Sequence, residues 1–131
     1  MKIKRAEIYK LALPLKEPFR TGFGELTNRR IIFVKLFDTN GLVGIGESAN
    51  MDFPLYEPDF NDATLLLLKK YLIPHILNKE INTVEELENI YASIKGNNFA
   101  KVAIEAAFWH LQSQQQNTPL RKLWGGEKMA Y

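Results

Sequence analysis

Extended segments come first in this chain and helical segments follow, and this order restricts the fold more than any other feature. Residues 3–15 read as extended, with alternating leucines near their end, and Pro14 and Pro18 exclude a helix there. Residues 31–37 are apolar on both faces, which is typical of a central, doubly covered strand. Residues 42–47 supply a third strand. The order predicts an α+β fold, in which helices pack on one face of a three-stranded antiparallel β-meander.

Two loops flank the predicted meander, and both are unusually apolar for surface segments. Residues 18–28 form a glycine-containing loop that carries Phe19 and Phe23. The second loop, residues 48–60, carries Met51, Phe53, Leu55 and Tyr56. Because both loops flank the same strands, their tips are expected to project from one end of the domain. Two interpretations remain open: the side chains fold back onto their own helices, or they form a lid or docking edge over a ligand held elsewhere.

The first and third predicted helices form most of the helical layer. The first runs from about residue 62 to residue 77, with Asp62 as its N-cap and an end or kink just before Pro74. The third and strongest helix covers residues 98–115, and its alanines allow neighbouring elements to approach closely. Together they predict a helical bundle after the meander.

Capping signals define two shorter helices. Thr83 and Glu86 have the spacing of a capping box, so a second helix is predicted to run to about residue 95, with Gly96 as its C-cap. A short last helix is predicted to start with Thr118 as N-cap and Pro119 at its first position, and two glycines at 125 and 126 stop it.

Composition excludes several classes of function. The 131 residues include no cysteine, which excludes thiol catalysis, disulfides and thiolate metal sites. The net charge of +2 is spread along the chain, so no nucleic-acid surface is expected. The apolar runs are too short to span a bilayer, and the basic start lacks the apolar segment of a signal peptide. A cytoplasmic protein without membrane contact is therefore expected.

No catalytic machinery is visible in the sequence. Gly44 and Gly46 have the spacing of a partial dinucleotide fingerprint, but no helix is predicted directly after them. The favoured interpretation is that these glycines let another backbone approach a strand closely. His75 and His110 lie on different predicted helices without a carboxylate at ligand spacing. We therefore predict no catalytic, cofactor-binding or metal-binding residue in this chain.

Four segments carry a family resemblance: residues 14–21 (PLKEPFRT), 44–47 (GIGE), 103–111 (AIEAAFWHL) and 117–126 (NTPLRKLWGG). Together they resemble the N-terminal capping domain of the enolase superfamily, in its muconate-lactonizing subgroup. Within it, the chain is most similar to o-succinylbenzoate synthases that also resemble N-succinylamino acid (N-acylamino acid) racemases. The segments that carry this finer likeness are residues 53–56, 61–62, 71–74, 95–96 and 100–101.

Two positions depart from the family pattern. His110 stands where the family usually has Asp, and Asn117 stands where it usually has Gly. Asn tolerates the left-handed conformation, so the second change is mild. The first change leaves open which polar contact replaces that of the Asp.

The resemblance implies a division of labour between two domains. Residues 1–126 would be the capping domain, and residues 127–131 would begin the linker to a (β/α)7β barrel that is absent from this chain, because a barrel alone needs about 250 residues. In the family, a barrel lysine removes the proton α to a carboxylate while a divalent metal such as Mg²⁺ stabilises the enediolate. The synthase dehydrates 2-succinyl-6-hydroxy-2,4-cyclohexadiene-1-carboxylate to o-succinylbenzoate for menaquinone, and the racemase returns the proton on the other face. This chain alone is expected to be inactive.

The resemblance also assigns a substrate-binding lid to five residues. Phe19 and Phe23 would exclude water and contact the apolar part of the substrate, and Thr21 would reach a polar group. Met51 and Tyr56 would shape the pocket over the succinyl-bearing portion. Closing such a pocket strengthens the electrostatics of the metal site. The implied partners are a C-terminal barrel, in the same or another chain, a small carboxylate substrate, and further copies in a homo-oligomer.

Two alternatives stay open. A relative with another substrate, such as a dipeptide epimerase or a muconate cycloisomerase, would share the same capping domain. A non-catalytic binding or assembly module would use the two apolar loops to hold a partner. The residues that follow Tyr131 distinguish the first alternative, and micromolar binding by the chain alone would favour the second.

Overall fold

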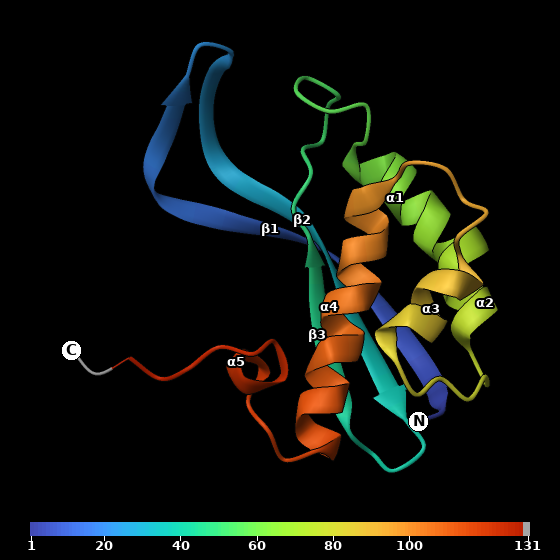
Figure 1. The fold of residues 1–131 in the computed structure, drawn as a ribbon. Coiled ribbons are helices and arrows are strands. Elements are labelled where there is room, and N and C mark those ends of the chain that lie inside the picture. Colours follow the sequence, from blue (N-terminus) through green and yellow to red (C-terminus); the bar gives the residue numbers. More distant parts are fainter. Residues whose placement is uncertain (130–131) are drawn as a thin grey trace.

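The computed structural model describes residues 1–129, which form an antiparallel sheet with helices packed against it (Figure 1). The strands are β1 (Ile3–Thr21), β2 (Gly24–Asp38) and β3 (Val43–Ser48), in the order β1-β2-β3. The helices are α1 (Asn61–Leu67), the π-helical turn η1 (Leu68–Leu72), α2 (Ile73–Ile76), α3 (Val84–Ile90), α4 (Asn98–Gln115) and α5 (Leu120–Leu123). The predicted α+β class and three-stranded meander are confirmed, and the described residues contain no barrel.

The core lies between the sheet and α4. Alternate residues of β2, at Ile32, Val34 and Leu36, are completely buried on the face that α4 covers. Phe108 and Leu111 of α4 are completely buried as well. α4 has the bounds that the sequence predicted, because its apolar positions run without interruption over this length.

Two glycines of β3 let α4 lie directly on the sheet. A Cβ atom on Gly44 would stand 1.9 Å from the carbonyl oxygen of Ala107, and one on Gly46 would stand 1.9 Å from that of Ala103. The predicted close approach of a second backbone is therefore confirmed. The alternative of a dinucleotide fingerprint is excluded, because an irregular segment separates β3 from the next helix.

The long hairpin of β1 and β2 replaces a predicted loop. Residues 18–28 were expected to be irregular, but Phe19 pairs with Leu26 and Thr21 pairs with Gly24, which leaves only residues 22 and 23 for the turn. Gly24 has a φ of +129°, a conformation that glycine accepts easily. The prediction was wrong because cross-strand pairing satisfies the backbone of this segment, and pairing is not encoded in its local composition.

The hairpin bends where its register shifts. Pro14 pairs with Asn28, and the next pair joins Phe19 to Leu26, so four residues of β1 stand opposite one residue of β2. Extra residues on one strand bend it and increase its twist. Figure 1 shows the end of the hairpin turned away from the rest of the sheet, and the loop after β3 extends from the same end of the domain.

The first helix has a different N-cap from the predicted one, and it extends to Ile76, close to the predicted end. Phe60 is its N-cap and offers no side-chain cap, whereas Asp62 lies in the first turn and forms an ion pair with Lys10. The positive end of the helix dipole stabilises a carboxylate in the first turn. The helix continues past Pro74 because the π-helical turn η1 precedes the proline and relieves the clash of its ring with the preceding turn.

Each of the two shorter helices differs from its predicted bounds at one end. α3 ends at Ile90, five residues before the predicted end, and Tyr91 rather than Gly96 is its C-cap. Tyr91 is buried in the core, and its backbone leaves the helical conformation to place the ring there. α5 has Pro119 rather than Thr118 as its N-cap, because the Thr118 hydroxyl donates instead to the carbonyl of Gln116.

The capping box of α3 gives a prediction about stability. The Thr83 hydroxyl accepts a hydrogen bond from the backbone N–H of Glu86 at 3.1 Å, as its spacing predicted. Thr83→Ala removes this acceptor and is expected to lower the free energy of unfolding by about 1 kcal/mol. Denaturant unfolding measures the change. Thr118→Ala is the matched control, because that hydroxyl accepts no hydrogen bond from the start of a helix, and an equal loss in both variants would contradict the assignment.

Candidate functional site

The two apolar segments predicted to project together meet in the structure. The rings of Phe23, at the hairpin turn, and Tyr56, in the loop after β3, pack edge to face with centroids 5.0 Å apart. Aromatic pairs prefer this arrangement, since the positive edge of one ring faces the negative face of the other. The hairpin and the loop therefore touch at their tips.

The apolar side chains of these tips do not fold back into the core. Phe23 is 61% exposed and Tyr56 is 65% exposed. The same holds for three further residues of the two segments: Phe19, Phe53 and Leu55. Of the two interpretations left open by the sequence, the structure supports the exposed apolar edge. A contiguous exposed apolar patch of this kind is typical of a docking or ligand-facing surface.

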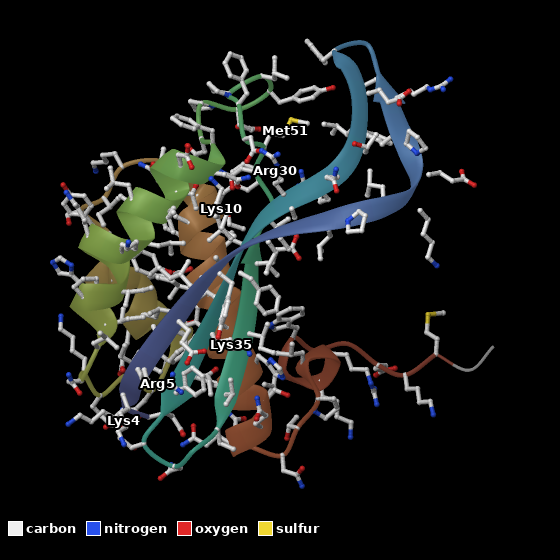
Figure 2. The ribbon with its side chains drawn as sticks, turned by 180° about the vertical axis from the view of Figure 1, so that it is seen from behind. Lys4, Arg5, Lys10, Arg30, Lys35 and Met51 are labelled. Carbon is white, nitrogen blue, oxygen red and sulfur yellow. The ribbon has the colours of Figure 1, made fainter. Side chains whose placement is uncertain are left out.

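Three adjoining hollows lie beneath these tips, and Met51 and Arg29 line all three. The hollow beside the bend of β1 has a volume of about 490 Å³, the one toward Tyr56 about 380 Å³, and the one along β2 about 280 Å³. The carbonyl of Met51 accepts a hydrogen bond from the Asn61 N–H at 2.8 Å, which ties the loop to the start of α1. Figure 2 shows Met51 and Arg30 at the base of the bent hairpin.

A polar network that the sequence did not reveal supports the loop from below. Asp52 accepts hydrogen bonds from the Asn61 amide at 2.7 Å and from the Arg30 guanidinium at 3.0 Å. Beside it, the buried Asn50 amide donates to the Thr64 hydroxyl at 2.8 Å. These residues have no periodic pattern in the sequence, so no signal there marked them. The network fixes the loop to β2 and α1 and leaves the apolar tips exposed.

The Asp52 network makes the stability of the loop dependent on pH. The hydrogen bond from Asn61, followed by that from Arg30 and its charge, holds the pKa of Asp52 below its ordinary value of 3.8. A lowered folded-state pKa adds stability above the ordinary value, and this stability is lost as the pH falls through the lowered pKa. We expect acid unfolding monitored from pH 5 to pH 2 to be less steep for Asp52→Asn than for the wild type. An identical pH profile would contradict the prediction.

Two polar side chains of the hairpin tip interact with other residues of the hairpin itself. The Thr21 hydroxyl accepts a hydrogen bond from the Phe23 N–H at 3.2 Å and lies 3.3 Å from the Gly24 carbonyl, to which it donates. In this conformation Thr21 holds the turn, and its predicted contact with a substrate stays a prediction. Arg20 pairs with Glu25 across the hairpin at 2.8 Å.

Other features of the described residues add no chemistry. Within residues 1–129, no group of three or more His, Asp or Glu side chains is placed to hold a metal ion. No helix in the same range is both long and apolar enough to cross a bilayer. A separate hollow between α3 and α4 is lined by Tyr91, and burial, together with Glu105 and Glu88, raises the pKa of its hydroxyl, which therefore stays neutral.

Comparison with known proteins decides the family. Residues 4–125 match the mandelate racemase / muconate lactonizing enzyme N-terminal domain. The chain belongs to this family. An o-succinylbenzoate synthase from Bacillus subtilis is 30% identical over 98% of this chain and 34% of its own length. An N-succinylamino acid racemase from Thermus thermophilus is 35% identical over 99% of this chain and 35% of its own length.

A solved structure agrees with the family assignment. A member of the enolase superfamily from Listeria innocua superposes with a TM-score of 0.92, at 30% identity, over 98% of this chain and 34% of the solved chain. The chain thus spans about a third of the length of the relatives it matches. It corresponds to the N-terminal domain of an enolase superfamily protein, and the resemblance found in the sequence is confirmed.

The histidine that departs from the family pattern makes a polar contact of its own. In this mandelate racemase / muconate lactonizing N-terminal domain, Nδ1 of His110 accepts a hydrogen bond from the Ile45 N–H at 3.2 Å. One turn later, the Gln114 amide donates to the carbonyl of Val43 at 2.7 Å. Both contacts satisfy backbone groups on the outer edge of β3, where an unpaired strand edge otherwise invites another chain.

Proposed function

We propose that this chain is the substrate-capping domain of an o-succinylbenzoate synthase-like enzyme. That enzyme would dehydrate 2-succinyl-6-hydroxy-2,4-cyclohexadiene-1-carboxylate to o-succinylbenzoate in menaquinone biosynthesis. The edge-to-face pair of Phe23 and Tyr56 carries the proposal. It joins two apolar segments into one exposed edge, and this edge does not cover the core of the domain. An edge of this kind suits a lid that closes over a ligand on another domain.

The same enzyme is proposed to racemise N-succinylamino acids as well. The observation that favours this second reaction is that a relative named N-succinylamino acid racemase, from Thermus thermophilus, is 35% identical, as similar as an o-succinylbenzoate synthase from Geobacillus stearothermophilus, also at 35%. Both proposed substrates carry a succinyl group, and both proposed reactions begin with removal of a proton from the carbon next to a carboxylate. One lid therefore serves either substrate.

Each predicted lid residue has a distinct part in this proposal. Phe19 and Phe23 exclude water and contact the apolar body of the substrate. Met51 and Tyr56 shape the space over the succinyl group, and Met51 lies where the three hollows adjoin. Thr21 holds the turn that presents Phe23. Excluding water lowers the local dielectric and strengthens the charge interactions on which proton abstraction depends.

The metal and the acid-base groups belong to the remainder of the enzyme in this proposal. A divalent metal such as Mg²⁺, when bound, would stabilise the negative charge of the enediolate. The described residues do not form a site for it. Residues 1–126 form the capping domain and residues 127–131 begin the linker to a barrel domain; residues 130 and 131 lie outside the described part. The full enzyme would be a cytoplasmic homo-oligomer.

The test compares this chain with the protein that continues beyond Tyr131. The longer protein is expected to dehydrate the cyclohexadiene substrate and to racemise N-succinylamino acids in the presence of Mg²⁺. The 131-residue chain, purified from a host without the longer protein, is expected to do neither. Activity in the chain alone, or no activity with either substrate in the longer protein, would overturn the proposal.

A further inference from the structure

Arg29 occupies an unusual place among the charged residues near the lid. It lines all three hollows beneath the two tips, and it is only partly exposed. A guanidinium presents five N–H donors in a fixed plane, which suits it to a carboxylate. Arg29 therefore places a positive charge where the hollows adjoin.

The neighbouring arginines are neutralised, whereas Arg29 is not. Arg30 forms an ion pair with Asp52 at 3.0 Å, and Arg20 pairs with Glu25 at 2.8 Å. Within residues 1–129, no carboxylate lies within salt-bridge distance of Arg29. One of its terminal nitrogens donates to the carbonyl of Ala49, which orients the guanidinium and leaves further donors for another acceptor.

The hollow beside the bend of β1 suits a short chain that ends in a carboxylate. Its volume is about 490 Å³, and its walls are mostly apolar. The residues that line it are Leu15, Glu17, Pro18, Phe19, Leu26, Asn28, Arg29 and Met51. Arg29 is the only cation among them, and Glu17, the only carboxylate among them, is exposed. Apolar walls contact the methylene groups of a ligand, and the single partly buried guanidinium of Arg29 can fix the position of its carboxylate.

We infer that Arg29 is a specificity-determining residue that binds the distal carboxylate of a succinyl substrate, an inference that rests on the proposed function. A succinyl group consists of two methylenes between a carbonyl and a carboxylate. Its methylenes would contact the apolar walls, and its carboxylate would accept hydrogen bonds from the guanidinium. The substrates of both proposed reactions carry this group, so one residue accounts for the selection of both.

The test uses the full protein that carries this chain and two substrates that differ in one charge. Arg29→Met is expected to raise KM for an N-succinylamino acid by roughly 10- to 100-fold, the effect of losing a charge-assisted hydrogen bond. For the matching N-acetylamino acid, which lacks the distal carboxylate, KM is expected to stay within about twofold, because the lost interaction is not made. Arg29→Lys is expected to bind the succinyl substrate more tightly than Arg29→Met but less tightly than the wild type. Lysine keeps the positive charge but lacks the planar pair of N–H donors that binds both carboxylate oxygens.

The control is Arg5→Met, which removes a guanidinium stacked on Phe37, on the sheet away from the lid. It is expected to leave both KM values unchanged. An equal rise in KM for the succinyl and acetyl substrates in Arg29→Met would overturn the inference, because the residue would then act only through its contact with Ala49.

A binding measurement on the wild type separates this inference from the proposed function. In a titration with succinate followed by NMR, the Arg29 Nε–Hε signal is expected to shift, and succinamide is expected to have no effect. If the full protein turns over neither substrate, the proposed function fails, and the succinate titration still decides on Arg29. No shift, or an equal shift with succinamide, would overturn the inference.

Discussion

Gly46→Ala is expected to destabilise this protein strongly, although it adds only one methyl group. The new Cβ would stand 1.9 Å from the Ala103 carbonyl oxygen and 2.8 Å from the Ala107 nitrogen, both in the backbone of α4. Backbone atoms cannot rotate away as a side chain does, so α4 must separate from β3. The separation opens the packing around Val34 and Phe108, which are completely buried. The free energy of unfolding is expected to fall by roughly 3 kcal/mol or more.

Gly22→Ala is the matched control for this experiment. Gly22 lies at the hairpin turn, a Cβ there would meet no atom within 4 Å, and its φ is not in the left-handed region. Its unfolding free energy is expected to stay within about 0.5 kcal/mol of the wild type. Urea unfolding followed by circular dichroism measures both variants. If Gly46→Ala unfolds at the same urea concentration as Gly22→Ala, the close packing of α4 on β3 is contradicted.

The local parts of this fold were predictable because their causes lie within a few residues of sequence. The apolar run of α4 set both of its ends, and the Thr83 cap depends only on the residue three positions later. The glycines at 44 and 46 were also interpreted correctly, since a strand with two small residues has little other reason to lack side chains.

The parts that failed depend on contacts between distant residues. The hairpin tip at residues 18–28 has the composition of a loop, and only its cross-strand pairing makes it a strand. α3 ends early because the Tyr91 side chain packs into the core, and this packing depends on residues distant in the sequence. The π-helical turn η1 depends on Pro74 several residues later, and a helical period does not show it.

The candidate site divides in the same way. The exposed aromatic edge was one of two interpretations left open by the sequence, because six apolar residues in two surface segments are unusual enough to mark the region. The supporting polar residues were not predictable. Arg29, Asp52 and Asn61 are common surface residue types, and only the folded structure brings them beneath the tips. A sequence indicates where apolar groups gather more readily than which polar groups face them.

The aromatic pair at the tips gives a large expected effect on activity, if the chain caps an active site as proposed. Phe23→Ala in the full protein is expected to lower kcat/KM for the dehydration by roughly 10- to 100-fold, because misplacing groups over a reacting centre by about 1 Å costs up to that much. The free energy of unfolding is expected to change by less than about 1 kcal/mol, since the ring is 61% exposed. The ratio of these effects separates a lid residue from a structural one.

A double-mutant cycle with Tyr56→Ala tests whether the two tips act as one unit. The rings touch at 5.0 Å, so removing either one also removes the support of the other. The loss in the double variant is expected to be about 2- to 10-fold smaller than the product of the two single losses. Tyr71→Ala is the control, because Tyr71 is a comparably exposed tyrosine on η1, in the helical layer. Losses in the tip variants no larger than in this control would show that the aromatic edge does not cover the reacting centre.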